Sequence, residues 1–215
     1  MDEDSWKGLL ASALSILGEL ESRGMGAPDF VLGGGTVLMM RYRHRLSKDV
    51  DLFLHDAQWL AYLTPRLNDH VAAMIRDYSE QANSVKLVLE DGDIDFIVSG
   101  TVTGDVSREK LEFQGRTIPL DTSAEILAKK LYFRAALLKP RDLFDLVVTH
   151  RADPLATGRA LEASAPRRVE QRKRVDALKH APLAELEKDI LSLGNFRDLL
   201  PTLISDSAAL LESAP

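Results

Sequence analysis

Cysteine is absent from all 215 positions of the chain. Its absence excludes a disulfide framework, a thiolate zinc site and a cysteine nucleophile. The chain also has no apolar run close to the roughly 20 residues that a membrane-spanning helix requires. Residues 2–4 are acidic, whereas a secretory signal begins with basic residues. We therefore expect a cytoplasmic protein with no membrane partner.

The chain also has fewer basic than acidic residues. It contains 27 lysines and arginines and 33 aspartates and glutamates, which gives a net charge of -6. A general nucleic-acid coat depends on many cationic side chains that meet phosphates, so that class of protein is disfavoured. Two local basic clusters remain, at residues 41–48 and 167–174. The second is typical of a solvated helix face, and both are compatible with contact to an RNA end.

Hydrophobic residues make up 45% of the chain, which is long enough to bury a core. Apolar spacing and turn residues predict helices at 5–23, from Thr36 onward and at 58–77, the last interrupted at Pro65. Strands are predicted at 30–32, 49–54, 84–89, 94–98 and 111–113. After Pro119 the pattern predicts only helices, at 123–138, 141–150, 156–179 and 182–213 with breaks near Gly194 and Pro201. We predict an α+β fold with an α/β domain at 1–120 and a C-terminal helical domain at 121–215.

Two aspartates one residue apart, Asp49 and Asp51, lie in an otherwise apolar stretch. Side chains on a strand alternate between its faces, so both carboxylates should point one way while Val50 and Leu52 enter a core. Like charges at roughly 6 to 7 Å on one face repel each other unless a cation neutralises them. Mg²⁺ is suited to this, because it takes one or two protein carboxylates together with substrate phosphates. The simpler alternative is a polar strand end at which Asp49 caps a turn.

A glycine triplet, Gly33–Gly35, lies between a predicted strand and a predicted helix. Glycines at such a turn let backbone N–H groups approach phosphates, and the helix N-terminus adds partial positive charge. The turn lacks the lysine of a P-loop and the spaced glycines of a dinucleotide-binding fold. A tight turn with no ligand is the alternative explanation.

Three segments together resemble the nucleotidyltransferase superfamily of the DNA polymerase β type: Leu-Gly-Gly-Gly-Thr at 32–36, Asp-Val-Asp-Leu at 49–52, and Ile-Asp-Phe at 94–96. Residues 44–53, 125–131 and 141–146 resemble more narrowly the AbiEii toxin family of nucleotidyltransferases. The resemblance covers residues 30–150. It implies a polymerase β-like domain with a small mixed sheet, followed by a helical region.

The resemblance also implies a role for individual residues. The residues expected to act in catalysis are Asp49, Asp51, Lys130 and Asp142. Those expected to bind the nucleotide are Gly34, Gly35, Thr36, Ser47 and Lys130. Asp49, Asp51 and Asp95 are expected to hold Mg²⁺ or Mn²⁺. Asp93 is the alternative to Asp95, which we prefer because its apolar neighbours place it within a strand.

Lys130 can also be judged from the residues around it. On a helix spanning 123–138 it falls within the apolar stripe, where an unpaired charge is costly. One explanation is a salt bridge to Asp142 or Asp145, and another is contact with a triphosphate. Asp142 follows Pro140 at the start of a predicted helix, so N-terminal capping is its alternative role.

The predicted reaction moves a nucleoside monophosphate from a nucleoside triphosphate to an acceptor. Resemblance to AbiEii relatives implies a toxin of a toxin–antitoxin pair, with transfer RNA as target and an antitoxin protein as partner. A protein or a small hydroxyl-bearing molecule is an alternative acceptor. The competing hypothesis is a noncatalytic nucleotide-binding or interaction module of the same fold.

Overall fold

The computed structural model describes residues 4–213, so the first three residues of the acidic start lie outside the described part. The chain divides into two compact units. The sheet unit comprises the chain up to Val37 together with Ser47–Gly100 and Arg108–Asp121. The helical unit comprises Leu38–Leu46, Thr101–Ser107 and the chain from Thr122 onward. Mixed α/β structure with C-terminal helices confirms the predicted fold class.

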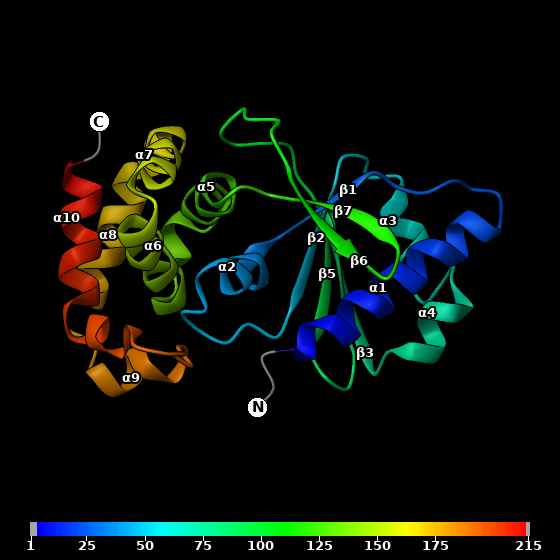
Figure 1. The fold of residues 1–215 in the computed structure, drawn as a ribbon, viewed down its shortest axis with the longest axis horizontal. Coiled ribbons are helices and arrows are strands. Elements are labelled where there is room, and N and C mark those ends of the chain that lie inside the picture. Colours follow the sequence, from blue (N-terminus) through cyan, green and yellow to red (C-terminus); the bar gives the residue numbers. More distant parts are fainter. Residues whose placement is uncertain (1–3, 214–215) are drawn as a thin grey trace. The chain divides into compact units, whose positions relative to one another are not determined.

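The sheet unit is built on a mixed sheet of seven strands in the order β3-β4-β5-β2-β1-β7-β6 (Figure 1). The strands are β1 (Phe30–Gly33), β2 (Val50–Leu54), β3 (Asp77–Gln81), β4 (Ser84–Val88), β5 (Asp93–Val98), β6 (Glu109–Phe113) and β7 (Arg116–Leu120). Strand β2 lies at the centre, antiparallel to β1 and parallel to β5. The strand with the paired aspartates therefore has a neighbour on each side.

One face of this sheet is apolar and the other carries the polar side chains. Along β2, Val50, Leu52 and Leu54 are fully buried, whereas Asp51 and Phe53 are partly exposed. The predicted alternation is confirmed for the strand, and Asp49 lies one residue before it. Helix α1 (Ser5–Ser22) packs on the apolar face because its leucines recur at helical spacing and are buried. Figure 1 shows α1 on the same side of the sheet as α3 (Trp59–Tyr62) and α4 (Asp69–Met74).

The helix predicted at 58–77 is interrupted around Pro65, as expected, and consists of two short helices, α3 and α4. The Asn68 side chain caps the second by accepting a hydrogen bond from the Val71 N–H. The predicted end at residue 77 is wrong. Residues 77–81 form β3 instead of continuing the helix. Only Tyr78 on β3 is partly buried, so this edge strand lacks the alternation of buried apolar residues that predicts a strand. Strand β7 pairs with β6 and includes Pro119, where the sequence pattern predicts the end of the sheet region, so this strand is an addition to the predicted ones.

The helical unit contains shorter helices than predicted. Helix α2 (Gly34–Tyr42) begins in the sheet unit and ends in the helical unit. The other helices are α5 (Ser123–Phe133), η1 (Ala135–Leu137), α6 (Pro140–Ala152), α7 (Pro154–Ala163), η2 (Ala165–Arg167), α8 (Arg168–Leu178), α9 (Leu183–Lys188), η3 (Phe196–Thr202) and α10 (Leu203–Ser213). Continuous helices at 123–138 and 156–179 are therefore wrong. In 182–213 the expected breaks are present, because Gly194 lies between α9 and η3 and Pro201 lies within η3. Pro166 and Pro201 lie in two of the 3₁₀ segments, as expected for a residue that cannot donate an N–H.

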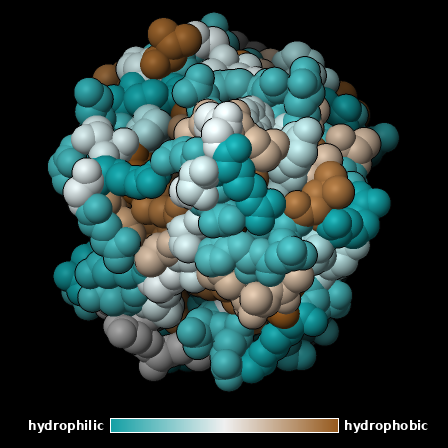
Figure 2. All heavy atoms as spheres, turned by 90° about the vertical axis from the view of Figure 1, so that its right-hand side faces the viewer, coloured by the Kyte–Doolittle hydropathy of each residue, from teal (hydrophilic) through white to brown (hydrophobic). Residues whose placement is uncertain are grey.

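Figure 2 shows the side of the molecule that lies at the right of Figure 1. Hydrophilic residues cover most of that face, and hydrophobic residues form small separate patches on it. Among residues 4–213, no helix combines the length and the apolar character needed to cross a bilayer.

Candidate active site

A row of directly opposed residues crosses the polar face of the sheet. Gly33 on β1 opposes Asp51 on β2, and Asp51 opposes Asp95 on β5. Asp95 in turn opposes Lys86 on β4. Opposed residues on paired strands point to the same face, so the two aspartates and the lysine lie side by side. Residues from four strands are thus brought into one row.

The close approach of Asp51 explains why position 34 is a glycine. Gly34 has a φ of +71°, and a Cβ atom added there would overlap the Asp51 carboxylate. A Cβ on Gly33 would lie 2.7 Å from the Phe53 ring and 2.9 Å from Asp121 Oδ2. Asp51 therefore lies against the first residue of α2, where backbone N–H groups have no helical partner and favour negative charge.

Thr36 and Gly35 lie in the first turn of α2, and both are buried. The Thr36 hydroxyl donates a hydrogen bond to the backbone carbonyl of Asp49. This bond fixes the backbone that leads into β2 and so positions the Asp49 carboxylate. Asp49 and Ser47 are themselves partly exposed.

Asp95 is held by Lys86. Lys86 Nζ lies 2.8 Å from Asp95 Oδ2 and 3.0 Å from Asp93 Oδ2. Burial raises the pKa of Asp95, Lys86 counteracts that rise, and the charges of Asp49 and Asp93 add to it. The influence of Asp49 on this pKa places its charge in the same cluster. Burial alone would lower the pKa of Lys86, but its bonds to the two aspartates outweigh that effect and raise it to about 12.

The chemistry of Asp49 and Asp51 fits a hard divalent cation. Mg²⁺ and Mn²⁺ bind carboxylate oxygens, and Mg²⁺ commonly takes one or two protein carboxylates and fills its remaining positions with water and phosphate. Among the residues that the structure describes, no group of three or more acidic or histidine side chains is close enough together to hold a metal ion. Asp49, Asp51 and Asp95 are all partly exposed, and of these Asp95 is bonded to Lys86.

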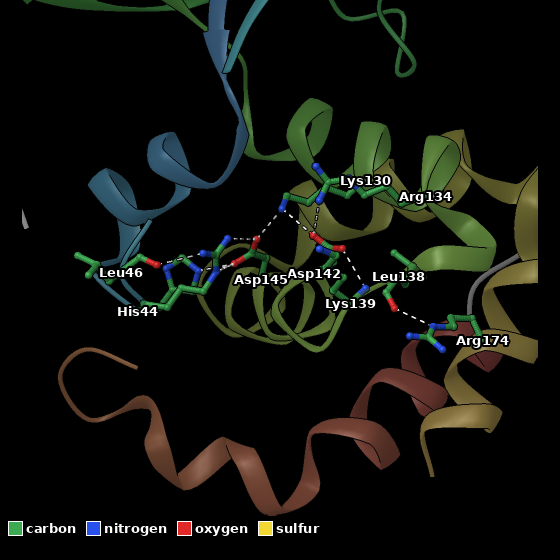
Figure 3. A network of polar contacts seen from close by, with 10 residues as sticks. His44, Leu46, Lys130, Arg134, Leu138, Lys139, Asp142, Asp145 and Arg174 are labelled. Atoms are coloured by element: carbon green, nitrogen blue, oxygen red, sulfur yellow. Dashed lines mark hydrogen bonds and ion pairs between the residues drawn. The ribbon is translucent and has the colours of Figure 1, made fainter. Parts of the chain in front are cut away.

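The helical unit has its own polar network, centred on α6 (Figure 3). Lys130 Nζ on α5 lies 2.9 Å from both Asp142 Oδ1 and Asp145 Oδ2. Arg45 donates to both oxygens of Asp145, with Nε at 2.6 Å and Nη2 at 2.8 Å. His44 Nε2 lies 2.7 Å from Asp145 Oδ1. The salt-bridge explanation for Lys130 therefore holds, with both of the aspartates considered for it.

The two aspartates of this network are buried but remain ionised. Burial by itself would raise the pKa of Asp145, but attraction to Arg45 and Lys130 outweighs burial and lowers it well below its usual value. The pKa of Asp142 is also lowered, because Lys130 and Arg134 outweigh the effect of burial. Asp142 Oδ2 additionally accepts the backbone N–H of Lys139, so the expected capping role at the start of α6 is present as well.

Two cationic residues in these clusters were missed in the sequence. Lys86 alternates with buried Val85 and Leu87, so alternation alone would have placed it on the polar face. Arg45 belongs to a recognised motif, but its partner Asp145 lies 100 residues away. Pairing between residues so far apart in the chain produces no recognisable pattern in the local sequence.

The comparison with protein families gives one match along most of the chain. The model for the nucleotidyl transferase AbiEii toxin of type IV toxin–antitoxin systems matches residues 15–209. A comparison with curated proteins gives no match. The matched range includes Gly34, Asp49 and Asp51 in the sheet unit and Lys130 and Asp142 in the helical unit. The chain belongs to the AbiEii family of nucleotidyltransferase toxins.

Proposed function

We propose that the protein transfers a nucleoside monophosphate from a nucleoside triphosphate to an acceptor, using Mg²⁺ or Mn²⁺ held by Asp49 and Asp51. The observation that carries this proposal is the fit between Gly34 and Asp51. A residue with no side chain lets a carboxylate reach the start of a helix, next to a second carboxylate positioned by Thr36. Two carboxylates beside the start of a helix suit a divalent cation that binds phosphate oxygens.

Each residue of the sheet unit has a defined task in this proposal. Asp49 and Asp51 hold the cation and accept the proton of the acceptor hydroxyl as its oxygen bonds to the α-phosphorus. The bond from that phosphorus to the departing pyrophosphate breaks in the same displacement. Backbone N–H groups of Gly34 and Gly35 and the hydroxyl of Ser47 bind phosphate oxygens. The bound cation supplies positive charge that stabilises the triphosphate and the pyrophosphate product.

Lys130 and Asp142 are the residues of the helical unit that are proposed to act in catalysis. Lys130 binds a phosphate group through its ammonium, and Asp142 orients that ammonium through the 2.9 Å ion pair. A lysine that is already fixed in place meets a phosphate without first being ordered. Catalysis is expected to fall when either residue is replaced.

Transfer RNA is the proposed acceptor, and a cognate antitoxin is the proposed protein partner. Family membership supports both, because the matched model describes a toxin of a type IV system. Arg172 and Lys173 on α8 are exposed and offer positive charge to an RNA backbone. Such a substrate would place the reaction in the cytoplasm. A protein or small-molecule acceptor is the alternative that the same chemistry allows.

The test is incubation of the full chain with each labelled nucleoside triphosphate, Mg²⁺ and either total RNA, purified transfer RNA or protein extract. Transfer of label is expected, and Asp49→Ala should reduce its rate on the order of a thousandfold, which corresponds to about 4 kcal/mol. Asp56→Ala, a change at an exposed position after β2, is the matched control and should leave the rate unchanged. Tight nucleotide binding without transfer to any acceptor would favour the noncatalytic module.

A further inference from the structure

Lys86 lies in the same row as the carboxylates. Val85 and Leu87 on either side of it are fully buried, so Lys86 points to the opposite face of the sheet. There it opposes Asp95, the direct neighbour of Asp51. Its ammonium lies within hydrogen-bond distance of Asp95 at 2.8 Å and of Asp93 at 3.0 Å. The cluster of carboxylates therefore already contains one cation of its own.

The Lys86 ammonium is bound on one side of the cluster. Its contacts are with Asp93 and Asp95 on β5, whereas Asp49 and Asp51 are supplied by β2 and the residue before it. The four aspartates are thus divided into a pair that a lysine neutralises and a second pair.

We propose that Lys86 is an internal counter-cation that withdraws Asp95 from metal binding, so that the sheet unit binds one divalent cation on Asp49 and Asp51. This inference rests on the proposed metal-dependent transfer. An ammonium bonded to Asp95 Oδ2 occupies an acceptor site on that carboxylate and repels a second divalent cation at short range. Asp93 is withdrawn in the same way. Lys86 acts as a positioning residue, because it determines which carboxylates remain for the ion.

The test is titration of the full chain with Mn²⁺, with the free ion followed by electron paramagnetic resonance. The unaltered protein is expected to bind one Mn²⁺. Lys86→Met should bind a second Mn²⁺, because Asp93 and Asp95 are then left without their cation. Adding Asp95→Asn to Lys86→Met should return the number to one. A Lys86→Met protein that binds no additional ion would overturn the proposal.

Three further variants make the result specific. Lys86→Arg keeps the positive charge and should bind one ion, like the unaltered protein. Lys86→Gln removes the charge but keeps a hydrogen-bond donor, so it repeats the test if Lys86→Met does not fold. Lys110→Met removes a positive charge at an exposed position on β6 and should bind one ion. A second ion in Lys110→Met as well would contradict a specific role for Lys86.

Failure of this inference can be distinguished from failure of the proposed function. If nucleotide transfer does not occur, or survives Asp49→Ala, the proposed function fails whatever the number of ions bound. The gain of an ion in Lys86→Met relative to Lys86→Arg, and its dependence on Asp95, are measured without nucleotide. Those two results test the role of Lys86 independently of the proposed function.

Discussion

Two lysines in this protein each bridge a pair of aspartates, one lysine in each unit. Lys86 bonds Asp93 and Asp95 at 3.0 and 2.8 Å, and Lys130 bonds Asp142 and Asp145 at 2.9 Å each. The lengths are nearly the same, but the Lys86 side chain is 36% exposed and the Lys130 side chain 9%. Solvent screens the first cluster, whereas the second has lost its hydration and depends on its partners.

The difference in burial changes what each cluster is expected to do. Ion pairs near solvent contribute little to stability. A substitution in the Lys86 cluster is therefore expected to change ion binding more than the free energy of unfolding. A buried network is strongly destabilised when one member is removed, because the remaining charges are left without partners. Similar bond lengths therefore do not imply similar energetic roles.

The largest effect on stability is expected from Asp145→Asn. Asp145 is fully buried and is contacted by His44, Arg45 and Lys130, so its neutralisation leaves two buried cations with less compensation. We expect the free energy of unfolding to fall by about 3–5 kcal/mol, measured by urea denaturation. Asp176→Asn removes an exposed ion pair to Lys179 and should cost less than about 1 kcal/mol. Equal losses in the two variants would contradict the contrast between buried and exposed pairs.

In the sheet unit the largest effect is expected at a glycine rather than at Lys86. Gly34→Ala combines a positive φ with an overlap against Asp51, whereas Gly24→Ala has a φ of +73° and no atom within 4 Å of its Cβ. Gly24→Ala should cost about 1 kcal/mol for its backbone conformation alone. Gly34→Ala should cost at least about 1 kcal/mol more, because close packing resists displacement of the carboxylate. Thermal unfolding of the matched pair measures the difference, and equal costs would show that Asp51 moves aside freely.

The two clusters should also differ in the sign of their response to pH. The pKa values of Asp142 and Asp145 are lowered by folding, so their contribution to stability is present above about pH 4, the unfolded value, and is lost as the pH falls through the folded values. The pKa of Asp95 is raised by folding. Its contribution to the free energy of unfolding is therefore present below about pH 4, the unfolded value, and is lost as the pH rises through the folded value. Urea denaturation across this range should show that Asp145→Asn flattens the acid loss of stability and that Asp95→Asn does not. An unchanged acid loss in Asp145→Asn would contradict the assignment.

The smallest effect on stability is expected from Lys86→Met. More than a third of the Lys86 side chain is exposed, and water can solvate Asp93 and Asp95 once the ammonium is gone. The free energy of unfolding should change by no more than about 1 kcal/mol. A loss as large as that of Asp145→Asn would mean that the sheet cluster is as dependent on its lysine as the helical cluster is.

Local patterns were sufficient for the parts of the site that lie on one strand or one turn. The alternation of Asp51 with Val50 and Leu52 predicted which face the carboxylate occupies. The expected strands at 84–89 and 94–98 correspond to β4 and β5. The opposition of Lys86 and Asp95 follows from the register of that pair of strands.

Tertiary contacts account for what could not be predicted. Nothing in the sequence near Gly34 indicates that the Asp51 carboxylate fills the space of its missing side chain. The pairing of Arg45 with Asp145 likewise depends on how segments 100 residues apart pack together. Strand β3 was missed because its exposed residues obtain their structure from pairing with β4 rather than from burial. Local propensity is weak where a neighbouring strand supplies the hydrogen bonds.

The order of the strands places β3 and β6 at the two borders of the sheet. Both borders carry outward-facing charge, with Asp77 and Glu80 on β3 and Glu109, Lys110 and Glu112 on β6. A foreign strand added to either border would bring its side chains next to these charged residues. Charged edge strands of this kind disfavour edge-to-edge aggregation, a hazard that exposed backbone hydrogen-bonding groups otherwise create.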